Sequence, residues 1–284
     1  MHKRSVFLIL LSSLPAFAAD RNVAIRFEAV VGSEKFACGR TYKGIGITKS
    51  SISPQDFRFY VHGVELIDET GKAVPLQLDQ DGKWQVDDVA LLDFENGTGG
   101  CANGNPDMNT EVRGTVPDGR YTGFRFILGV PFAANHADLT KQPSPLNLTA
   151  LFWSWNAGHK FARLDISSTG LPRGFLIHLG STGCSPHQTR ATIPTDCSNP
   201  NRVAVEFPHF DSDRDTVTAD LAALLADTNV DTNQKDTPAG CMSGTEDRDC
   251  VGLFSNLGLP FGGKAGGLQR FFRMSSQSEV SAGN

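Results

Sequence analysis

The stretch from residue 56 to residue 66 reads DFRFYVHGVEL, and its apolar side chains recur at every second position. Successive side chains of a β-strand point to opposite faces, so Phe57, Phe59 and Val61 fall on one face. A period of two with large apolar residues on one side predicts a strand that borders an apolar core.

Further strand-like runs lie on both sides of this stretch, separated by Asp-Gly, Asn-Gly and Gly-Gly turn signals. They cover residues 23–30, 89–94, 121–130, 146–155, 160–167, 175–179 and 202–207. Short strands at such spacing predict an all-β fold, an antiparallel β-sandwich or barrel with long loops. Because neither an internal repeat nor a linker interrupts the pattern, we expect one domain over residues 19–273.

Two segments depart from the strand pattern. Residues 217–226 contain Leu221, Leu224 and Leu225 at helical spacing, and the acidic residues before them suit a helix N-terminus, so one short helix is predicted. Residues 274–284 are rich in serine and are predicted to form a disordered tail.

The N-terminus has the composition of an export signal. A basic Met-His-Lys-Arg start precedes an apolar run over residues 6–14 and an Ala-Phe-Ala end at residues 16–18. This order predicts a cleavable signal peptide at residues 1–18, with a buried N-terminal helix as the alternative. The apolar run is too short to span a bilayer, and no later run is longer. We therefore expect a periplasmic or secreted protein without a membrane span after cleavage.

The chain contains 6 cysteines, an even number that favours disulfides in an exported protein. None lies in Cys-x-x-Cys or Cys-x-x-Cys-His, which disfavours a thioredoxin-like motif, a zinc ribbon and attached haem. Several pairings remain open, and a pair of thiolate metal ligands is an alternative. Proximity in the sequence suggests Cys184 with Cys197 and Cys241 with Cys250, leaving Cys38 with Cys101.

Charge and short motifs exclude several classes of function. The net charge is −5 and no basic block occurs, so a nucleic-acid partner is not expected. Residues 211–215 and 227–233 resemble the start of a calcium loop but lack the glycine and glutamate of an EF-hand. A looser calcium site or capped turns remain open there. Gly180 to Cys184 is not a nucleophile elbow, because the serine directly follows the first glycine.

Histidine and tryptophan supply the candidate site. His178 lies within the apolar run 175–179, where it is either a core residue or a metal ligand, and His136 and His62 are further candidates. No His-x-His occurs, so a metal site needs residues from distant strands. Trp153 and Trp155 flank one serine, which places both indoles on one face of a strand. They are either two core residues or a redox-active pair with one modified indole.

Several motifs occur together in a fixed order. They are Trp84-Gln85, residues 90–95, Cys101, Gly129-Val130-Pro131, residues 135–138, residues 143–147, residues 152–161, residues 178–184 and residues 241–244. In this set the chain resembles the MbnP-like family, also called metallo-mystery pair four-Cys motif proteins with a Trp-x-Trp signature. The family is associated with methanobactin and is related to the copper proteins MopE and CorA.

The resemblance implies a function. Family members are exported and encoded beside a dihaem protein similar to cytochrome c peroxidase and MauG, which oxidises a tryptophan to kynurenine. The product takes part in copper binding. Carried onto this sequence, the resemblance implies Trp153 or Trp155 as the modified residue, and His136 and His178 as copper ligands with His62 as a third candidate. The ion is expected to be Cu(I), which accepts few and soft ligands. This chain is then a protein substrate and not an enzyme.

Two other functions remain open from the sequence. One is a structural or adhesive secreted β-sandwich, with calcium at the acidic loops and core histidines. The other is a cupredoxin-like electron carrier, which is disfavoured because its copper loop needs a free cysteine.

Overall fold

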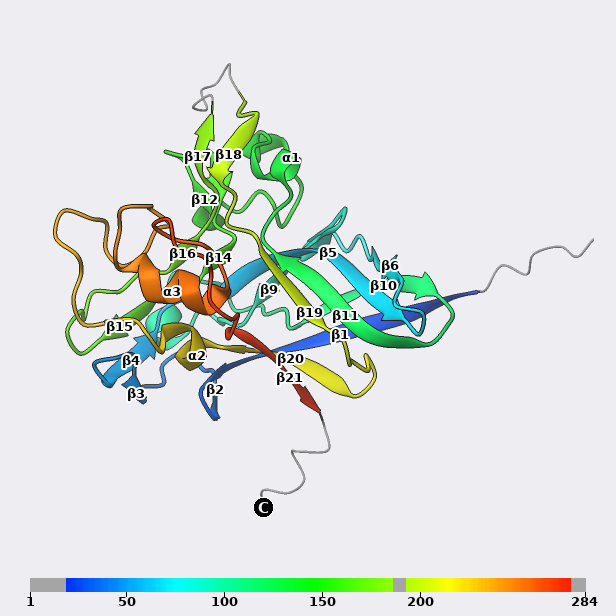
Figure 1. Cartoon of the computed structure of the whole chain (residues 1–284), viewed down its shortest axis with the longest axis horizontal. Coiled ribbons are helices and arrows are strands. Elements are labelled where there is room, and N and C mark those ends of the chain that lie inside the picture. Colours follow the sequence, from blue (N-terminus) through cyan, green and yellow to red (C-terminus); the bar gives the residue numbers. More distant parts are fainter. Residues whose placement is uncertain (1–18, 186–192, 277–284) are drawn as a thin grey trace, which may run out of the picture.

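Two β-sheets packed face to face form the body of the protein (Figure 1), as the alternation around residues 56–66 predicts. The computed structural model describes residues 19–185 and 193–276. The predicted signal peptide, residues 1–18, lies outside these residues. Within them, no helix is long and apolar enough to cross a membrane.

The first sheet has six strands in the order β21-β20-β1-β10-β7, with β2 paired to β1. Its strands are β1 (Asp20–Val31), β2 (Glu34–Lys35), β7 (Gln77–Leu78), β10 (Glu111–Pro117), β20 (Asp215–Asp220) and β21 (Phe272–Ser276). The pair β1–β20 is parallel, whereas the sequence predicted only antiparallel pairs. The chain leaves β1 and returns in β20 only after crossing the second sheet, which allows that direction.

The second sheet has eight strands with the central order β16-β14-β5-β11-β19, to which β6, β9 and β8 are added. Its strands are β5 (Arg58–Asp68), β6 (Ala73–Pro75), β8 (Gln85–Val86), β9 (Val89–Asp93), β11 (Tyr121–Leu128), β14 (Ala162–Arg163), β16 (His178–Leu179) and β19 (Val203–Phe207). The stretch that the sequence singles out therefore becomes the central strand β5.

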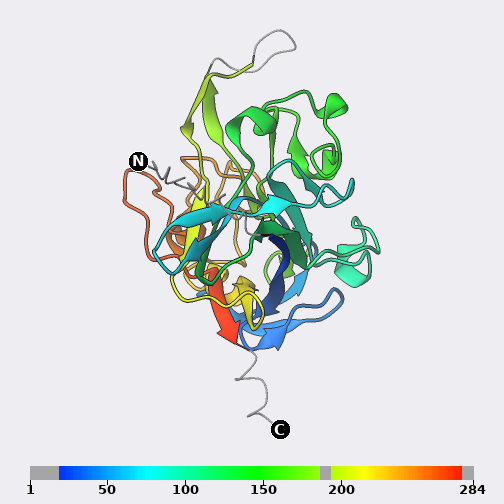
Figure 2. The same cartoon turned by 90° about the vertical axis from the view of Figure 1, so that its right-hand side faces the viewer.

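Small sheets and short helices decorate this sandwich. The small sheets contain β3 (Tyr42–Ile45), β4 (Ser50–Pro54) and β15 (Ile166–Ser168); β12 (Phe152–Trp153) and β13 (Gly158–His159); and β17 (Thr182–Ser185) and β18 (Asp196–Asn199). The helices are α1 (Phe132–Asn135), α2 (Leu221–Leu225) and α3 (Cys250–Leu257), with 3-10 turns η1 (Gly99–Cys101), η2 (Leu139–Lys141) and η3 (Thr149–Leu151). Figures 1 and 2 show α1, β17 and β18 standing together at one end of the molecule.

Aromatic rings fill the space between the two sheets. The ring centroid of Phe27 in β1 lies 6.2 Å from that of Phe59 in β5 and 5.6 Å from that of Phe126 in β11. Phe272 of β21 lies 5.4 Å from Phe59 and 5.1 Å from Phe126. Edge-to-face pairs of this kind add to the free energy gained by burying the rings. The predicted inward face of β5 is thereby confirmed.

The other face of β5 carries Arg58, Tyr60 and His62, and all three are buried as well. The segment of residues 129–161 covers this face. The Tyr60 hydroxyl donates to the carbonyl oxygen of Pro145 at 2.8 Å, and its ring meets that of His159 edge to face. The second sheet therefore has a polar layer on the side away from the aromatic core, and this layer holds the candidate site.

Three predicted segments differ from the structure. The helix predicted at 217–226 is strand β20 up to Asp220, because the β-branched residues there favour a strand, and helix α2 follows with the Asp220 side chain as its cap. The run 146–155 is mostly a 3-10 turn and loop, with only Phe152–Trp153 in a strand. The predicted tail begins too early, since β21 extends to Ser276; residues 277–284 lie outside the described residues.

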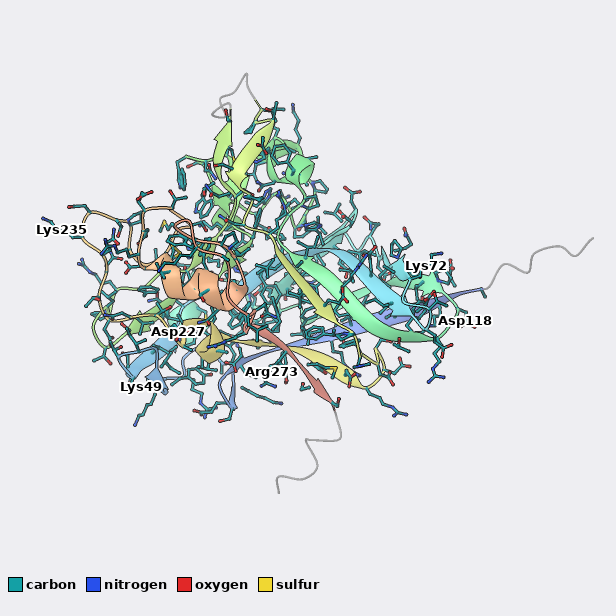
Figure 3. All side chains as sticks on the ribbon, viewed as in Figure 1. Lys49, Lys72, Asp118, Asp227, Lys235 and Arg273 are labelled. Carbon is teal, nitrogen blue, oxygen red and sulfur yellow. A yellow bond between two sulfur atoms is a disulfide. The ribbon has the colours of Figure 1, made fainter. Side chains whose placement is uncertain are left out.

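The structure has three disulfides, and all three pairs are as predicted: two join cysteines that lie near each other in the sequence, and the third joins the two cysteines that remain. The pairs are Cys38–Cys101, Cys184–Cys197 and Cys241–Cys250. Charged side chains such as Lys49, Lys72, Asp118 and Lys235 point outward from separate parts of the molecule (Figure 3).

Candidate metal centre

A row of charged residues crosses the second sheet on its polar side. The strand register aligns His178 of β16 with Arg163 of β14, Arg163 with Arg58 of β5, and Arg58 with Asp93 of β9. Three further carboxylates join this row, and we call the whole set the ion ladder. The ion ladder consists of Asp56, Arg58, Asp93, Glu95, Arg163, Asp165 and His178, and all but Arg163 are buried.

Close ion pairs hold the ion ladder together. The Nε of Arg163 lies 2.7 Å from Oδ2 of Asp165 and 3.2 Å from Oδ2 of Asp56. The Nε of Arg58 donates to Oδ1 of Asp56 at 2.8 Å. Removing one member of such a buried pair leaves an uncompensated charge, which is strongly destabilising. The ladder therefore makes a rigid support for His178 at its end.

Three carboxyl groups of the ion ladder have shifted pKa values, and burial raises the pKa of Asp56 although Arg58 acts in the opposite direction. Burial opposes ionisation of Asp165, but the hydrogen bond from His178 and the neighbouring Arg163 guanidinium keep the pKa of Asp165 below its usual range. Burial raises the pKa of Asp93 to about 8, although Arg58 acts in the opposite direction. Asp93 therefore holds its proton at neutral pH, and its Oδ2 has no hydrogen-bond partner among the described residues.

One ring nitrogen of His178 is hydrogen-bonded, and the other has no partner among the described residues. Its Nε2 lies 3.0 Å from Oδ1 of Asp165, and since a carboxylate can only accept, Nε2–H is the donor. In a neutral imidazole this leaves the lone pair on Nδ1. That atom is buried and has no partner within residues 19–185 and 193–276. A buried lone pair without a partner is costly unless a ligand uses it.

The Trp153 and Trp155 rings touch each other, but they differ in exposure. Their centroids are 5.3 Å apart; Trp153 is 4 % exposed and Trp155 is 56 % exposed. Trp155 lies in the turn after β12 and not in a continuing strand, so the predicted shared strand face is replaced by a strand–turn contact. The Trp153 centroid lies 6.4 Å from that of His178, and the Nε1 of Trp153 has no described partner.

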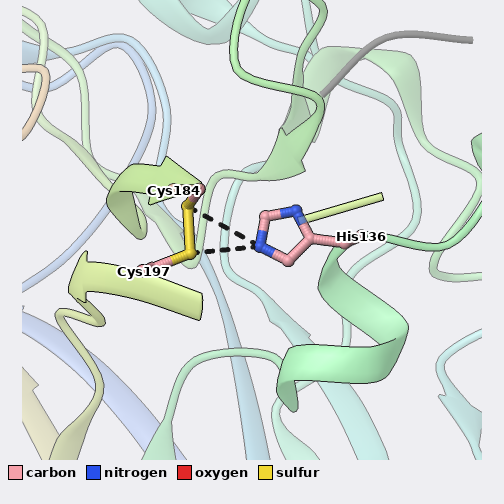
Figure 4. A group of neighbouring side chains, drawn as sticks. All are labelled: His136, Cys184 and Cys197. Atoms are coloured by element: carbon pink, nitrogen blue, oxygen red, sulfur yellow. Dashed lines mark hydrogen bonds between the residues drawn. A yellow bond between two sulfur atoms is a disulfide. The ribbon is translucent and has the colours of Figure 1, made fainter. Parts of the chain in front are cut away.

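His136 follows α1 and contacts the same tryptophan turn from another side. Its Nδ1 lies 3.2 Å from the carbonyl oxygen of Ala157, the neighbour of Gly158, which pairs with Trp153. Its Nε2 lies 3.3 Å from the Sγ of Cys197 and 3.7 Å from that of Cys184 (Figure 4). The turn of residues 153–158 is thus contacted by both predicted ligands, by His178 through Trp153 and by His136 through Ala157.

The other histidines are placed elsewhere. His62 lies four residues along β5 from Arg58, and His178 lies two strands across the sheet from Arg58. The usual rise per residue and strand spacing therefore put the Cα atoms of His62 and His178 roughly 16 Å apart. One ion cannot contact both. Burial lowers the pKa of His62 to about 4, partly offset by Asp88. Both ring nitrogens of His159 face backbone carbonyl oxygens: Nε2 lies 2.9 Å from that of Leu146 and Nδ1 lies 3.3 Å from that of Asn135.

Sequence reasoning missed the ion ladder, including Asp165. A signal for it exists, because Arg58, Tyr60 and His62 share the face of β5 opposite Phe57, Phe59 and Val61. A second polar face in a strand with so many large residues indicates burial on both sides.

The acidic loops that resemble calcium loops have other partners. Oδ2 of Asp215 accepts from the backbone N–H of Asp211, and Oδ1 accepts from the hydroxyl of Ser276. Oδ1 of Asp231 accepts from the hydroxyl of Ser50 and from the backbone N–H of Gly170. These carboxylates close turns and join segments of the chain. Their contacts agree with the prediction of capped turns, the alternative to a calcium site in both loops.

Comparison with known proteins decides the family. A sequence model of the MbnP family matches residues 20–243, most of the chain. The chain belongs to the MbnP family. Among solved structures, MbnP from Methylosinus trichosporium is similar with a TM-score of 0.82 and 31% sequence identity, covering 91% of this chain and 99% of that chain. A search of curated proteins finds no match.

The MbnP match includes nearly every candidate residue. Trp153, Trp155, His136 and His178 lie within residues 20–243, as does the whole ion ladder. Of the disulfide cysteines, only Cys250 lies beyond the matched range. The resemblance seen in the sequence motifs is therefore confirmed at the level of the family.

Proposed function

We propose that this MbnP family member is an exported copper-binding protein that is not itself an enzyme. Its copper site forms after a dihaem partner oxidises Trp153 to kynurenine. The observation that carries the proposal is a pair of buried nitrogens in neighbouring rings, Nδ1 of His178 and Nε1 of Trp153, neither of which has a hydrogen-bond partner among the described residues. Imidazole suits copper, so the residues present fit the ion.

The difference in exposure supports separate roles for the two indoles. Trp155 is the exposed member of the pair and lies where a partner protein can reach it. Trp153 is buried against His178, so a change in its ring alters the surroundings of the ligand. In our proposal Trp155 passes oxidising equivalents inward and Trp153 is converted.

Conversion to kynurenine changes what the residue at position 153 can do. One molecule of dioxygen, or two of hydrogen peroxide that leave two waters, supplies two oxygen atoms at the partner's haems; these cleave the indole C2–C3 bond, and water then releases C2 as formate. The hard redox chemistry belongs to those haems, while this chain positions the indole. An indole offers only an N–H donor, whereas the aniline nitrogen of kynurenine also has a lone pair.

His178 is the primary ligand in this proposal and His136 the second. Copper, supplied as Cu(I), would be held by Nδ1 of His178 and the converted residue. His136 would have to turn its ring to join them, since its Nδ1 donates to Ala157 and its Nε2 faces the disulfide. The position of His62 on the far part of β5 excludes it from this site.

Copper titration of ligand variants tests the proposal. Protein co-produced with the dihaem partner is titrated with Cu(I) against a competing chelator, and His178→Ala and His136→Ala are compared with His209→Ala, whose side chain is exposed. The proposal expects a large loss of affinity for His178→Ala and none for His209→Ala. Unchanged affinity in His178→Ala contradicts it, and unchanged affinity in His136→Ala removes His136 from the site.

A further inference from the structure

The contact between His136 and the Cys184–Cys197 disulfide brings three potential metal ligands together. The Nε2 of His136 and the two sulfur atoms all lie within 4.8 Å of one another (Figure 4). It is the one such group of three among the residues that the structure describes. His136 and Cys197 are buried and Cys184 is half-buried.

Hydrogen bonds set the tautomer of His136 and leave Nε2 as an acceptor that now takes the Asn135 amide N–H; a metal ion at Nε2 would replace that donor. A carbonyl oxygen can only accept, so Nδ1–H donates to Ala157 and the lone pair lies on Nε2. The backbone N–H of His159 donates to Oδ1 of Asn135 at 2.7 Å, which turns the Asn135 amide nitrogen toward Nε2 at 3.1 Å. The tautomer with an unprotonated Nε2 is thereby favoured from both sides.

The hairpin of β17 and β18 keeps the two sulfur atoms together whether or not they are bonded. Cys184 and Cys197 are direct partners in its register, flanked by the pairs Thr182–Asn199 and Ser185–Asp196. Opposed Cβ atoms in an antiparallel pair lie about 4.5–5.5 Å apart. That spacing lets two unbonded sulfurs contact one ion at about 2.3 Å each, the usual metal–thiolate distance for zinc.

We propose that reduction of the Cys184–Cys197 disulfide turns this group into a metal site of two thiolates and the His136 imidazole. A dithiol reductant supplies two electrons and two protons and becomes a disulfide, while the protein disulfide becomes two thiols. Each thiol then releases its proton when the ion binds. Thiolate ligands select soft ions, so Cu(I) is the expected occupant. In the disulfide form the sulfurs are not thiolates and the site is closed.

This second site is independent of tryptophan oxidation. It uses Nε2 of His136 on the hairpin side and needs neither His178 nor a converted Trp153, whereas in the proposed function His136 joins those two residues only after its ring turns. The variant Trp153→Phe is therefore expected to lose the first site and to keep the second. Failure of one proposal leaves the other intact.

The test compares oxidised and reduced protein produced without the dihaem partner. Anaerobic Cu(I) titration against a chelator is combined with alkylation and peptide mass analysis, which shows which cysteines are free. We expect reduced protein with free Cys184 and Cys197 to bind one more Cu(I) than the oxidised protein, with a thiolate–Cu(I) absorption band. The double variant Cys184→Ser/Cys197→Ser should not gain this ion. Reduced protein with both thiols free and no additional Cu(I) would overturn the proposal.

His136 variants test the third ligand without removing the disulfide. We expect His136→Ala to lower the affinity of the reduced site by about 10- to 100-fold or more, the range that even outer-shell changes produce. His209→Ala should leave it unchanged. If the double serine variant fails to fold, His136→Ala decides, because its disulfide can be formed first and its fold verified before reduction. Equal affinity in His136→Ala and the parent chain would overturn the three-ligand site.

Discussion

His178 and Asp165 form a buried pair in which Nε2–H of the imidazole donates to Oδ1 of the carboxylate at 3.0 Å. The pair lies at the end of the ion ladder and leaves Nδ1 of His178 without a described partner beside Trp153. Metal-ligating histidines commonly donate their second nitrogen to a carboxylate in this way, which fixes the tautomer and the ring orientation. Asp165 is therefore a positioning residue in our account.

The first prediction concerns Asp165→Asn. Because an amide fixes the His178 tautomer less firmly, we expect Cu(I) affinity to fall by about 10- to 100-fold. Nitrogen NMR of the His178 ring should show the Nε2–H tautomer in the parent chain and a mixture in the variant. Asp118→Asn, an exposed change, is the control. An unchanged tautomer together with unchanged affinity would remove Asp165 from this role.

The second prediction concerns Gly180→Ala. A Cβ at Gly180 would lie 2.3 Å from the Cζ3 atom of Trp153 and 2.8 Å from the carbonyl oxygen of His159. The indole must shift, so we expect a changed near-ultraviolet circular dichroism spectrum and slower oxidation of Trp153. Gly119→Ala, where the nearest atom is 3.9 Å away, should show neither effect. Parent-like spectra and oxidation rates in Gly180→Ala would count against a fixed indole position.

The third prediction concerns pH and Asp93. The pKa of Asp93 is raised to about 8, so the folded protein keeps a proton that the unfolded chain releases above its ordinary carboxyl pKa. Stability should therefore fall as pH rises toward 8, with a slope from this group of up to about 1.4 kcal/mol per pH unit. Urea unfolding at several pH values should show this slope in the parent chain and a smaller one in Asp93→Asn. Identical slopes would show that Asp93 titrates normally.

The fourth prediction compares two disulfides. Cys38–Cys101 closes a loop with a sequence separation of 63, and Cys241–Cys250 one of 9. On the chain-entropy model, removing the first costs about 4 kcal/mol and removing the second about 2.7 kcal/mol. Urea unfolding of Cys38→Ala/Cys101→Ala and Cys241→Ala/Cys250→Ala measures both. A larger loss for the shorter loop would contradict the entropic account.

The sandwich could be predicted because its central strand has an unambiguous pattern. Phe57, Phe59 and Val61 specify the inner face of the strand, two disulfide pairs follow from proximity in the sequence, and the third is the pair that remains. Residues 217–226 were harder, because leucines at helical spacing follow directly on a β-branched run, and only the Asp220 cap separates strand from helix. A periodic pattern alone does not mark that boundary.

The candidate site could be predicted only in part. His178 and Trp153 are named by sequence motifs, and the structure places their rings next to each other. Asp165 could not be identified, because its contact with His178 depends on the pairing of β14 with β16. The contact of His136 with the disulfide likewise joins α1 to the β17–β18 hairpin, and no local pattern encodes that approach.

In our proposal Trp153 is oxidised and then shares copper with His178. Intact mass and copper content of protein co-produced with the dihaem partner test it most directly, with Trp153→Phe, Trp155→Phe and Trp84→Phe in parallel. Because the partner's haems perform the oxidation, loss of one carbon and gain of one oxygen should add about 4 Da to the parent chain and to Trp84→Phe. Peptide mapping should place this change at Trp153, and both proteins should contain copper. Trp155→Phe should be converted more slowly, and Trp153→Phe should show neither the mass change nor the copper. An unmodified parent chain without copper, or the same mass increase in Trp153→Phe, would contradict the account.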